Sequence, residues 1–147
     1  MNYLLDTNIV LAYVRQANII HEIDRLYDPL NEERTPAISV VSVGEIKSIA
    51  IRNKWGNRKI TLLETMLNKF VVADTNVRRI IERYAEIDAF SQGKLTNQTT
   101  PFPFTARNMG KNDLWIAATA SILDIDLLTS DKDFEHLDGA YIRLAKV

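Results

Sequence analysis

The chain has 147 residues, a length that one globular domain fills and two do not. Hydrophobic residues make up 46% and charged residues 25%, the profile of an ordinary globular protein. The sequence holds no cysteine, which excludes disulfides, thiolate nucleophiles and cysteine-ligated zinc. The formal net charge of -1 provides no overall basic field, so a polyanion would have to bind through local charges or a metal ion.

We expect one domain over residues 1–147, in the cytoplasm. No basic patch precedes a long apolar stretch at the amino terminus, and no apolar run approaches membrane-spanning length. Repeats and low-complexity tracts are absent from the sequence. The five glycines form neither a phosphate loop nor a dinucleotide fingerprint.

Apolar, β-branched runs alternate along the chain with segments of helical periodicity. The first strand (1–5) precedes a helical pattern over 7–16 that continues over 19–27, with Thr7 or Asn8 as the expected N-cap. The later elements alternate in the same way. Strands are expected at 37–43, 71–74, 125–131 and 140–147, and helices at 44–55, 57–70, 77–90 and 111–124, with a turn or short helix at 132–137. This order predicts an α/β sandwich around a mainly parallel sheet.

One long stretch, residues 91–110, has no regular pattern, because it contains two prolines and many polar side chains. The only two histidines of the chain are His21 and His136. We expect both on the surface, where neither would serve a catalytic triad or a two-histidine metal site.

Four acidic residues adjoin apolar runs, and each has an ordinary structural explanation. Asp6 follows a strand and could cap the next helix. Glu45 lies three residues after Ser42, the spacing of a capping box. Asp113 would lie in the first turn of a helix, where the helix dipole favours an acid. Asp131 follows a strand and could form an Asx-turn.

The four acids are stronger evidence for a functional site together than any one of them is alone. The carboxyl ends of parallel strands and the N-termini of the following helices share one edge of a sheet, which is also where ligands bind in such folds. All four carboxylates can therefore point into one cleft. They would repel one another there and raise each other's pKa, which a divalent cation relieves. Oxygen ligands without thiolate or imidazole favour Mg²⁺ or Mn²⁺ over Zn²⁺.

The chain resembles the PIN-domain nucleases, and in particular the VapC-type toxins of bacterial toxin–antitoxin pairs. The matching segments are "LLDTN" with Asp6, "SVVSVGEI" with Glu45, "KNDLWIAATA" with Asp113 and "LLTSDKDF" with Asp131. They occur in the order found in the family and span nearly the whole chain. The resemblance implies a three-layer α/β/α sandwich.

The resemblance also implies roles for individual residues. Asp6, Glu45, Asp113 and Asp131 would be the acidic metal-binding and catalytic residues. Three supporting residues match polar positions of the family motifs: Thr129, two before the last acid, Asn8, two after the first, and Asp133, an alternative or helper to Asp131. The sequence does not separate Asp131 from Asp133 as the main fourth acid.

The implied activity is Mg²⁺- or Mn²⁺-dependent endoribonuclease cleavage that leaves a 5′-phosphate and a 3′-hydroxyl. The implied partners are RNA, a small antitoxin that threads a tail across the cleft, and a second copy of the chain in a homodimer. The segment before the third acid is longer than usual in the family. It could shape the substrate groove or the antitoxin contact, or be a tolerated surface insertion.

Basic residues form a further hypothesis about RNA binding. Arg107 and Lys111 are the cations nearest the acids in sequence, and both are candidates for phosphate contacts. A second basic group surrounds Trp55 and could equally be a solvated helix face. This group consists of Arg52, Lys54, Arg58 and Lys59.

Two alternatives accompany the nuclease hypothesis. A haloacid-dehalogenase-like phosphatase also begins with an aspartate after a strand, but it requires a second aspartate where this chain has Asn8. A PIN-like module that binds RNA or protein without cutting would be indicated by the loss of an acid. All four acids are present, which favours an enzyme.

Overall fold

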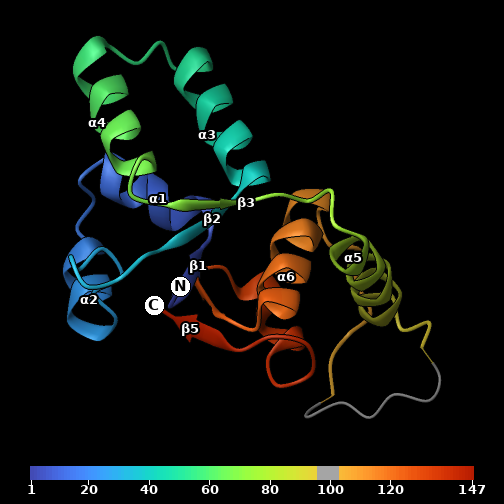
Figure 1. Cartoon of the computed structure of the whole chain (residues 1–147). Coiled ribbons are helices and arrows are strands. Elements are labelled where there is room, and N and C mark those ends of the chain that lie inside the picture. Colours follow the sequence, from blue (N-terminus) through green and yellow to red (C-terminus); the bar gives the residue numbers. More distant parts are fainter. Residues whose placement is uncertain (96–102) are drawn as a thin grey trace.

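The computed structural model describes residues 1–95 and 103–147 (Figure 1). Part of the segment 91–110, whose role the sequence leaves open, falls outside the described residues. The strands are β1 (Tyr3–Leu5), β2 (Ala37–Ser39), β3 (Val71–Ala73), β4 (Asp126–Thr129) and β5 (Leu144–Lys146). The helices are α1 (Thr7–Val14), α2 (Ile20–Leu26), α3 (Val40–Arg52), α4 (Asn57–Leu67), α5 (Arg78–Ser91), α6 (Lys111–Leu123) and a 3₁₀ helix η1 (Lys132–Leu137).

The five strands form one sheet in the order β3-β2-β1-β4-β5, and every neighbouring pair is parallel. Leu4 of β1 pairs with Ala37 on one side and with Leu127 on the other. β1 therefore lies at the centre of the sheet. The strand order reverses direction around it, which makes its carboxyl end a typical ligand position in α/β folds.

Helices cover both faces of the sheet, as the predicted sandwich requires. Successive strand residues point to opposite faces, so Leu4 packs in the core with α5 and α6, while Leu5 packs with α1, α3 and α4. Both leucines are fully buried. Figure 1 shows the first four helices on one side of the sheet and α5 and α6 on the other. The expected three-layer α/β/α fold is confirmed.

The predicted strand over 37–43 is wrong beyond Ser39. Its β-branched residues continue into α3, because the Ser39 hydroxyl accepts a hydrogen bond from the Val41 amide at 3.1 Å and caps the helix. The capping box expected from Ser42 and Glu45 is therefore also wrong. Ser42 lies within α3, and Glu45 lies one turn later than the sequence suggested.

Other boundaries differ by a few residues. The helical pattern over 7–27 breaks into α1 and α2, and Gln16 between them has a φ of 53°, in the left-handed region that ends helices. The strand predicted to reach Asp131 ends at Thr129. α6 is confirmed within one residue, and Asp124, which follows its last residue, has a left-handed conformation.

His21 lies on the surface as predicted, but the prediction for His136 is wrong. His136 is only 2% exposed, and its Nε2 lies 2.8 Å from the Ser91 hydroxyl at the end of α5. The residue packs against Phe90 and Phe104. In the part of the chain that the structure describes, no helix combines the length and the apolar character needed to cross a membrane.

Candidate functional site

The acidic residues predicted from the sequence converge at the carboxyl edge of the sheet. Asp6 follows β1 and Asp131 follows β4 by one further residue, and these two strands are hydrogen-bonded neighbours. Asp113 lies in the first turn of α6. Glu45 comes from α3, which packs against both α1 and α6.

Asp6 is the most deeply buried of these acids, at 3% exposure. One carboxylate oxygen caps α1 by accepting the Thr7 amide at 2.8 Å. The other oxygen accepts the Thr129 hydroxyl at 2.8 Å. The Thr129 oxygen in turn accepts the Asp131 amide at 2.9 Å. Asp6 therefore fills the N-cap position, rather than Thr7 or Asn8, and it is held in a single orientation.

Glu45 is positioned through two hydroxyl groups that sequence reasoning did not identify as part of the site. The Thr7 hydroxyl oxygen lies 2.9 Å from a Glu45 carboxylate oxygen and 2.8 Å from the Ser42 hydroxyl. A carboxylate only accepts, so the Thr7 hydroxyl donates to Glu45 and can accept from Ser42. Thr7 directly follows the first acid, and Ser42 lies almost one helical turn before Glu45, on the same side of α3; these spacings were the available signals.

Three aspartates form the closest group of carboxylates. Oxygens of Asp113, Asp131 and Asp133 all lie within 4.8 Å of one another. Asp131 caps η1, and its side chain accepts the Asp133 amide at 2.9 Å. The structure thus places both Asp131 and Asp133 in this group, and both stay candidates for the fourth acid.

The spacing of these oxygens suits a divalent cation. Opposite ligands of an octahedral Mg²⁺ lie about 4.2 Å apart, and those of the larger Ca²⁺ about 5 Å apart. A set of carboxylate oxygens within 4.8 Å can therefore close around one hard cation after small side-chain rotations. The donors are all oxygens, which fits Mg²⁺ or Mn²⁺ and not a thiolate-binding metal.

The crowding of acids changes their protonation. Burial, followed by repulsion from Asp6, Asp131, Glu45 and Asp133, raises the pKa of Asp113 to about 7. Burial also raises the pKa of Asp6, partly offset by its hydrogen bonds from Thr129 and Thr7. Asp113 is thus repelled by all four of the other carboxylates, and Asp6 by Asp131 and Glu45. A cation at the site would neutralise this excess of negative charge.

The predicted supporting residues differ in their placement. Thr129 is buried and joins Asp6 to Asp131, as described above. Asn8 is exposed in the first turn of α1, and Lys111 is exposed at the start of α6. Arg107 is half-buried just before α6.

The second basic group is not brought to the acids. It surrounds the α3–α4 connection, about 10 Å along α3 from Glu45. Lys59 lies over the ring of Trp55 at 4.9 Å in a cation–π contact. The half-buried Trp55 packs against the core on this side of the sheet, so the structure favours the solvated helix end for this group.

The fold is thus an α/β/α sandwich of the class that binds ligands at the switch point of its parallel sheet, and the side chains gathered at that point are oxygen donors of the kind that hard cations prefer. The PIN domain family model matches residues 3–140, so the chain belongs to the PIN domain family. The phosphatase alternative is thereby set aside. No curated protein sequence gave a match to the chain.

Solved structures share this fold along their whole length. VapBC2 from Rickettsia felis, bound to a DNA fragment from its promoter, has a TM-score of 0.76 at 21% identity, and the match covers 99% of this chain and 98% of that chain. DNA-bound VapBC from Salmonella typhimurium has a TM-score of 0.71 at 19% identity with the same coverage. VapBC-1 from nontypeable Haemophilus influenzae has a TM-score of 0.67 at 24% identity, again over 99% and 98%. At these identities the likeness establishes the fold, and the resemblance to PIN domains of the VapC type is confirmed.

Proposed function

We propose that this protein is a divalent-metal-dependent endoribonuclease and the toxin of a toxin–antitoxin pair. The observation that carries the proposal is the group of Asp113, Asp131 and Asp133, whose oxygens lie within 4.8 Å of one another, with Asp6 and Glu45 acting electrostatically on the same site. Charged side chains are seldom buried without a partner, and a divalent cation would relieve the repulsion among five acids held at a ligand-binding edge.

In this proposal Asp113, Asp131 and Asp133 hold the cation directly, with Asp6 beside them. A bound Mg²⁺ or Mn²⁺ would lower the pKa of the attacking water and neutralise charge on the phosphate. Because Asp113 has its pKa near 7, cation binding at neutral pH displaces a proton from it. The affinity for metal should therefore rise with pH.

The residues around the cation position have distinct roles in the proposal. Thr129 fixes the orientation of Asp6 and of the Asp131 backbone, so the ligands need little rearrangement when a cation binds. Glu45 has one oxygen held by Thr7. Its second oxygen accepts no hydrogen bond from the residues that the structure describes, and it is free to take a proton from the attacking water.

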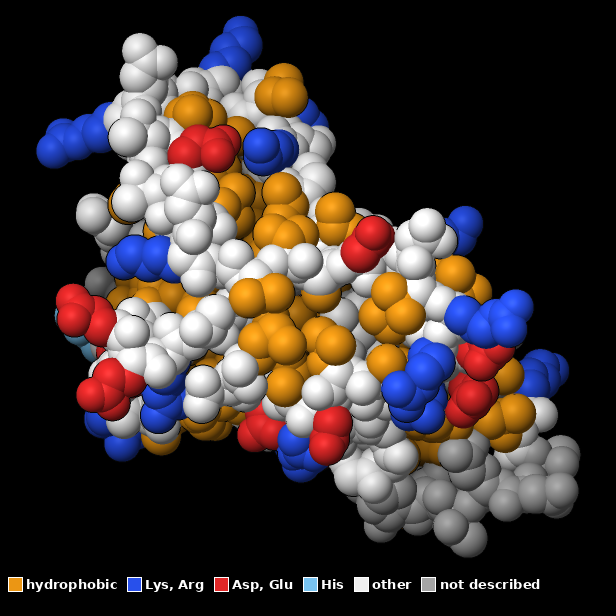
Figure 2. All heavy atoms as spheres, viewed as in Figure 1, with side chains coloured by type: hydrophobic (Ala, Val, Ile, Leu, Met, Phe, Trp, Pro, Cys, Tyr) orange, Lys and Arg blue, Asp and Glu red, His pale blue; other side chains and the backbone are white. Residues whose placement is uncertain are grey.

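The partners follow from the same family. Related solved structures are described as a toxin–antitoxin complex and as a member of the VapBC family of toxin–antitoxin systems, and we infer that this chain binds an antitoxin. We also propose that it forms a homodimer. Hydrophobic side chains gather over α3 and β3 on the face shown in Figure 2. Exposed apolar residues on these two elements include Val40, Ile51, Val71 and Val72, and apolar surface of this kind favours contacts between proteins.

Cleavage of RNA by purified, antitoxin-free protein tests the proposal. We expect discrete fragments with 5′-phosphate and 3′-hydroxyl ends in Mg²⁺ or Mn²⁺, none in chelator and none from Asp6→Asn. Asparagine also caps helices well, so this variant should keep the fold. A PIN-like module that only binds would shift RNA in a gel without cutting it. That result would reject the enzyme in favour of the non-cutting alternative.

A further inference from the structure

A pocket of about 350 Å³ opens beside the carboxylate cluster. It is formed by the segment that leads into α6, from Thr105 to Gly110, together with Asp133 of η1. Asp133 also belongs to the close group of three aspartates. The pocket and the candidate cation position therefore share a wall, so that a molecule in one lies next to the other.

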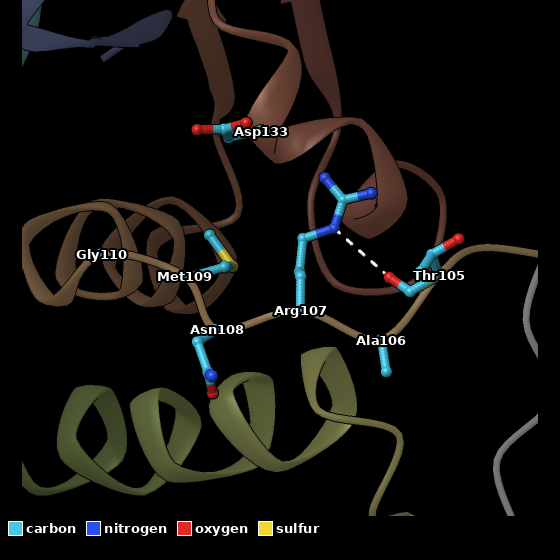
Figure 3. Close-up of a pocket in the computed structure, with 7 residues that line it drawn as sticks. All are labelled: Thr105, Ala106, Arg107, Asn108, Met109, Gly110 and Asp133. Carbon is cyan, nitrogen blue, oxygen red and sulfur yellow. Dashed lines mark hydrogen bonds between the residues drawn. The ribbon is translucent and has the colours of Figure 1, made fainter.

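Arg107 is the only cation among the residues that line this pocket. Figure 3 shows its side chain extending toward η1, on the side where Asp133 lies, while Ala106 and Asn108 point the opposite way, toward α5. Among the residues that the structure describes, the Arg107 side chain makes one hydrogen bond, a long contact of 3.5 Å from Nε to the Thr105 carbonyl. Within residues 1–95 and 103–147 it makes no ion pair, which leaves the terminal nitrogens of a half-buried guanidinium available to a ligand.

The backbone that carries Arg107 is firmly attached to the rest of the molecule. The Arg107 amide donates to the Ser91 carbonyl at 2.8 Å, and the Ser91 hydroxyl lies 3.3 Å from the Met109 sulfur and 2.8 Å from His136. Just upstream, Phe104 packs on Phe90 with ring centroids 4.9 Å apart. The pocket is thus preformed, and its guanidinium is presented by an ordered segment and not by a free loop tip.

We propose that this pocket binds the phosphate of the nucleotide that flanks the cleaved bond, with Arg107 as the residue that contacts its oxygens, in single-stranded RNA. The proposal rests on the proposed function and deepens it. A guanidinium offers parallel N–H donors that match two phosphate oxygens. The pocket volume lies near the lower end of the range for ligand pockets, about 300–1,000 Å³, which suits a single nucleotide.

The geometry favours RNA over an acidic segment of a protein partner. A chain whose cleaved phosphate lies at the cation position carries its next phosphate covalently beside it. If the strand leaves the cation position along the wall formed by Asp133, that phosphate passes the neighbouring pocket. An acidic side chain of a protein partner has no covalent link to the cation position that would fix where it lies.

The test compares Arg107→Ala, Arg107→Lys and the control Arg79→Ala. Arg79 is exposed in the first turn of α5, about 18 Å along that helix from its Ser91 end. Initial rates are measured with Mn²⁺ on a random-sequence pool of short single-stranded RNA, over a range of salt concentrations. Melting temperatures of all variants check that the fold is kept.

We expect Arg107→Ala to lower kcat/KM by roughly 10- to 100-fold, mainly through KM, as for loss of a hydrogen bond to a charged group. Its plot of log(kcat/KM) against log[salt] should be shallower than wild type by about 0.7, the contribution of one phosphate contact in single strands. Arg107→Lys should restore the salt slope and part of the KM, and Arg79→Ala should match wild type.

Three results would overturn this inference without touching the nuclease. One is equal kcat/KM and salt slope in Arg107→Ala and Arg79→Ala, and another is a loss in kcat alone that lysine does not repair. The third is unchanged cleavage with weaker inhibition by the antitoxin, which would assign the pocket to that partner. If the wild type itself cleaves nothing, the proposed function fails first, and the pocket proposal fails with it.

Discussion

Replacing Asp113 by asparagine should stabilise the metal-free protein at neutral and alkaline pH. Burial and the four neighbouring carboxylates raise the pKa of Asp113 from 3.8 to about 7. Between these values the folded state binds more protons than the unfolded state, so the penalty grows as pH rises and is complete above about pH 7. An asparagine side chain at this position carries no charge, so the neighbouring carboxylates would not repel it.

The size of the effect follows from the pKa difference. At about 1.4 kcal/mol for each pH unit, the full penalty would be about 4 kcal/mol, and solvent screening of a half-buried carboxylate reduces it to about 2 kcal/mol. The helix dipole acts in the opposite direction, because Asp113 lies in the first turn of α6, but it contributes only about 0.3–1 kcal/mol. We therefore expect a net gain of about 1–2 kcal/mol, or roughly 2–8 °C in Tm for a domain of this size.

The assay is thermal unfolding followed by circular dichroism, in chelator, from pH 5 to pH 8. The matched control is Glu82→Gln, which removes one negative charge from an exposed position on α5. Saturating Mn²⁺ should raise the Tm of wild type, because an ion at one hundred times its Kd adds about 2.7 kcal/mol to the free energy of unfolding. It should have little effect on the Tm of Asp113→Asn. A variant that is less stable than wild type at pH 8 in chelator, or a gain that does not shrink toward pH 5, would refute the electrostatic reasoning.

Three further perturbations test other parts of the structure. Thr129→Val should cost about 1–3 kcal/mol in urea unfolding and lower kcat, because it leaves an Asp6 oxygen and the Asp131 amide without their partner; Thr129→Ser should recover most of both, and equal behaviour of the two variants would contradict the role of the hydroxyl. Burial lowers the pKa of His136 from 6.5 to about 4, so the unfolded state binds more protons between these pH values. Acidification from pH 6.5 to pH 4 should therefore lower the free energy of unfolding by up to about 3 kcal/mol. The stability of His136→Gln should depend less steeply on pH, and a slope equal to that of wild type would rule the histidine out as its source. Ser39→Ala should lower stability by about 1 kcal/mol through loss of the α3 cap, whereas no change in urea unfolding would show that the cap is dispensable.

The order of elements and the fold class could be predicted from the sequence because strands and helices alternate with clear periodicity. The strand ends could not. The run from Ala37 to Val43 is rich in β-branched residues, yet the helix begins after three strand residues, where the Ser39 hydroxyl caps it. Local propensity is similar on both sides of that point, so tertiary packing determines the boundary.

The acids of the site were predictable for a related reason. Residues that follow parallel strands meet at one edge, so Asp6 and Asp131 could be placed together from the strand pattern alone. The links between them could not be predicted. Thr7 and Ser42 come from two different helices, and their contact with Glu45 depends on how those helices pack. His136 was misplaced because a polar residue in a polar stretch carries no sign that the 3₁₀ helix turns it inward.

The most direct test of the proposed metal-dependent nuclease is one Mn²⁺ titration in which metal binding and RNA cleavage are followed on the same protein. We expect the cleavage rate to rise along the binding curve, and both midpoints to move to lower Mn²⁺ as pH rises through 7. Asp113→Asn should lose both signals while remaining folded. Cleavage that persists in chelator, or full metal binding by Asp113→Asn, would contradict the claim that the carboxylates at this edge form one site that binds the cation and cuts RNA.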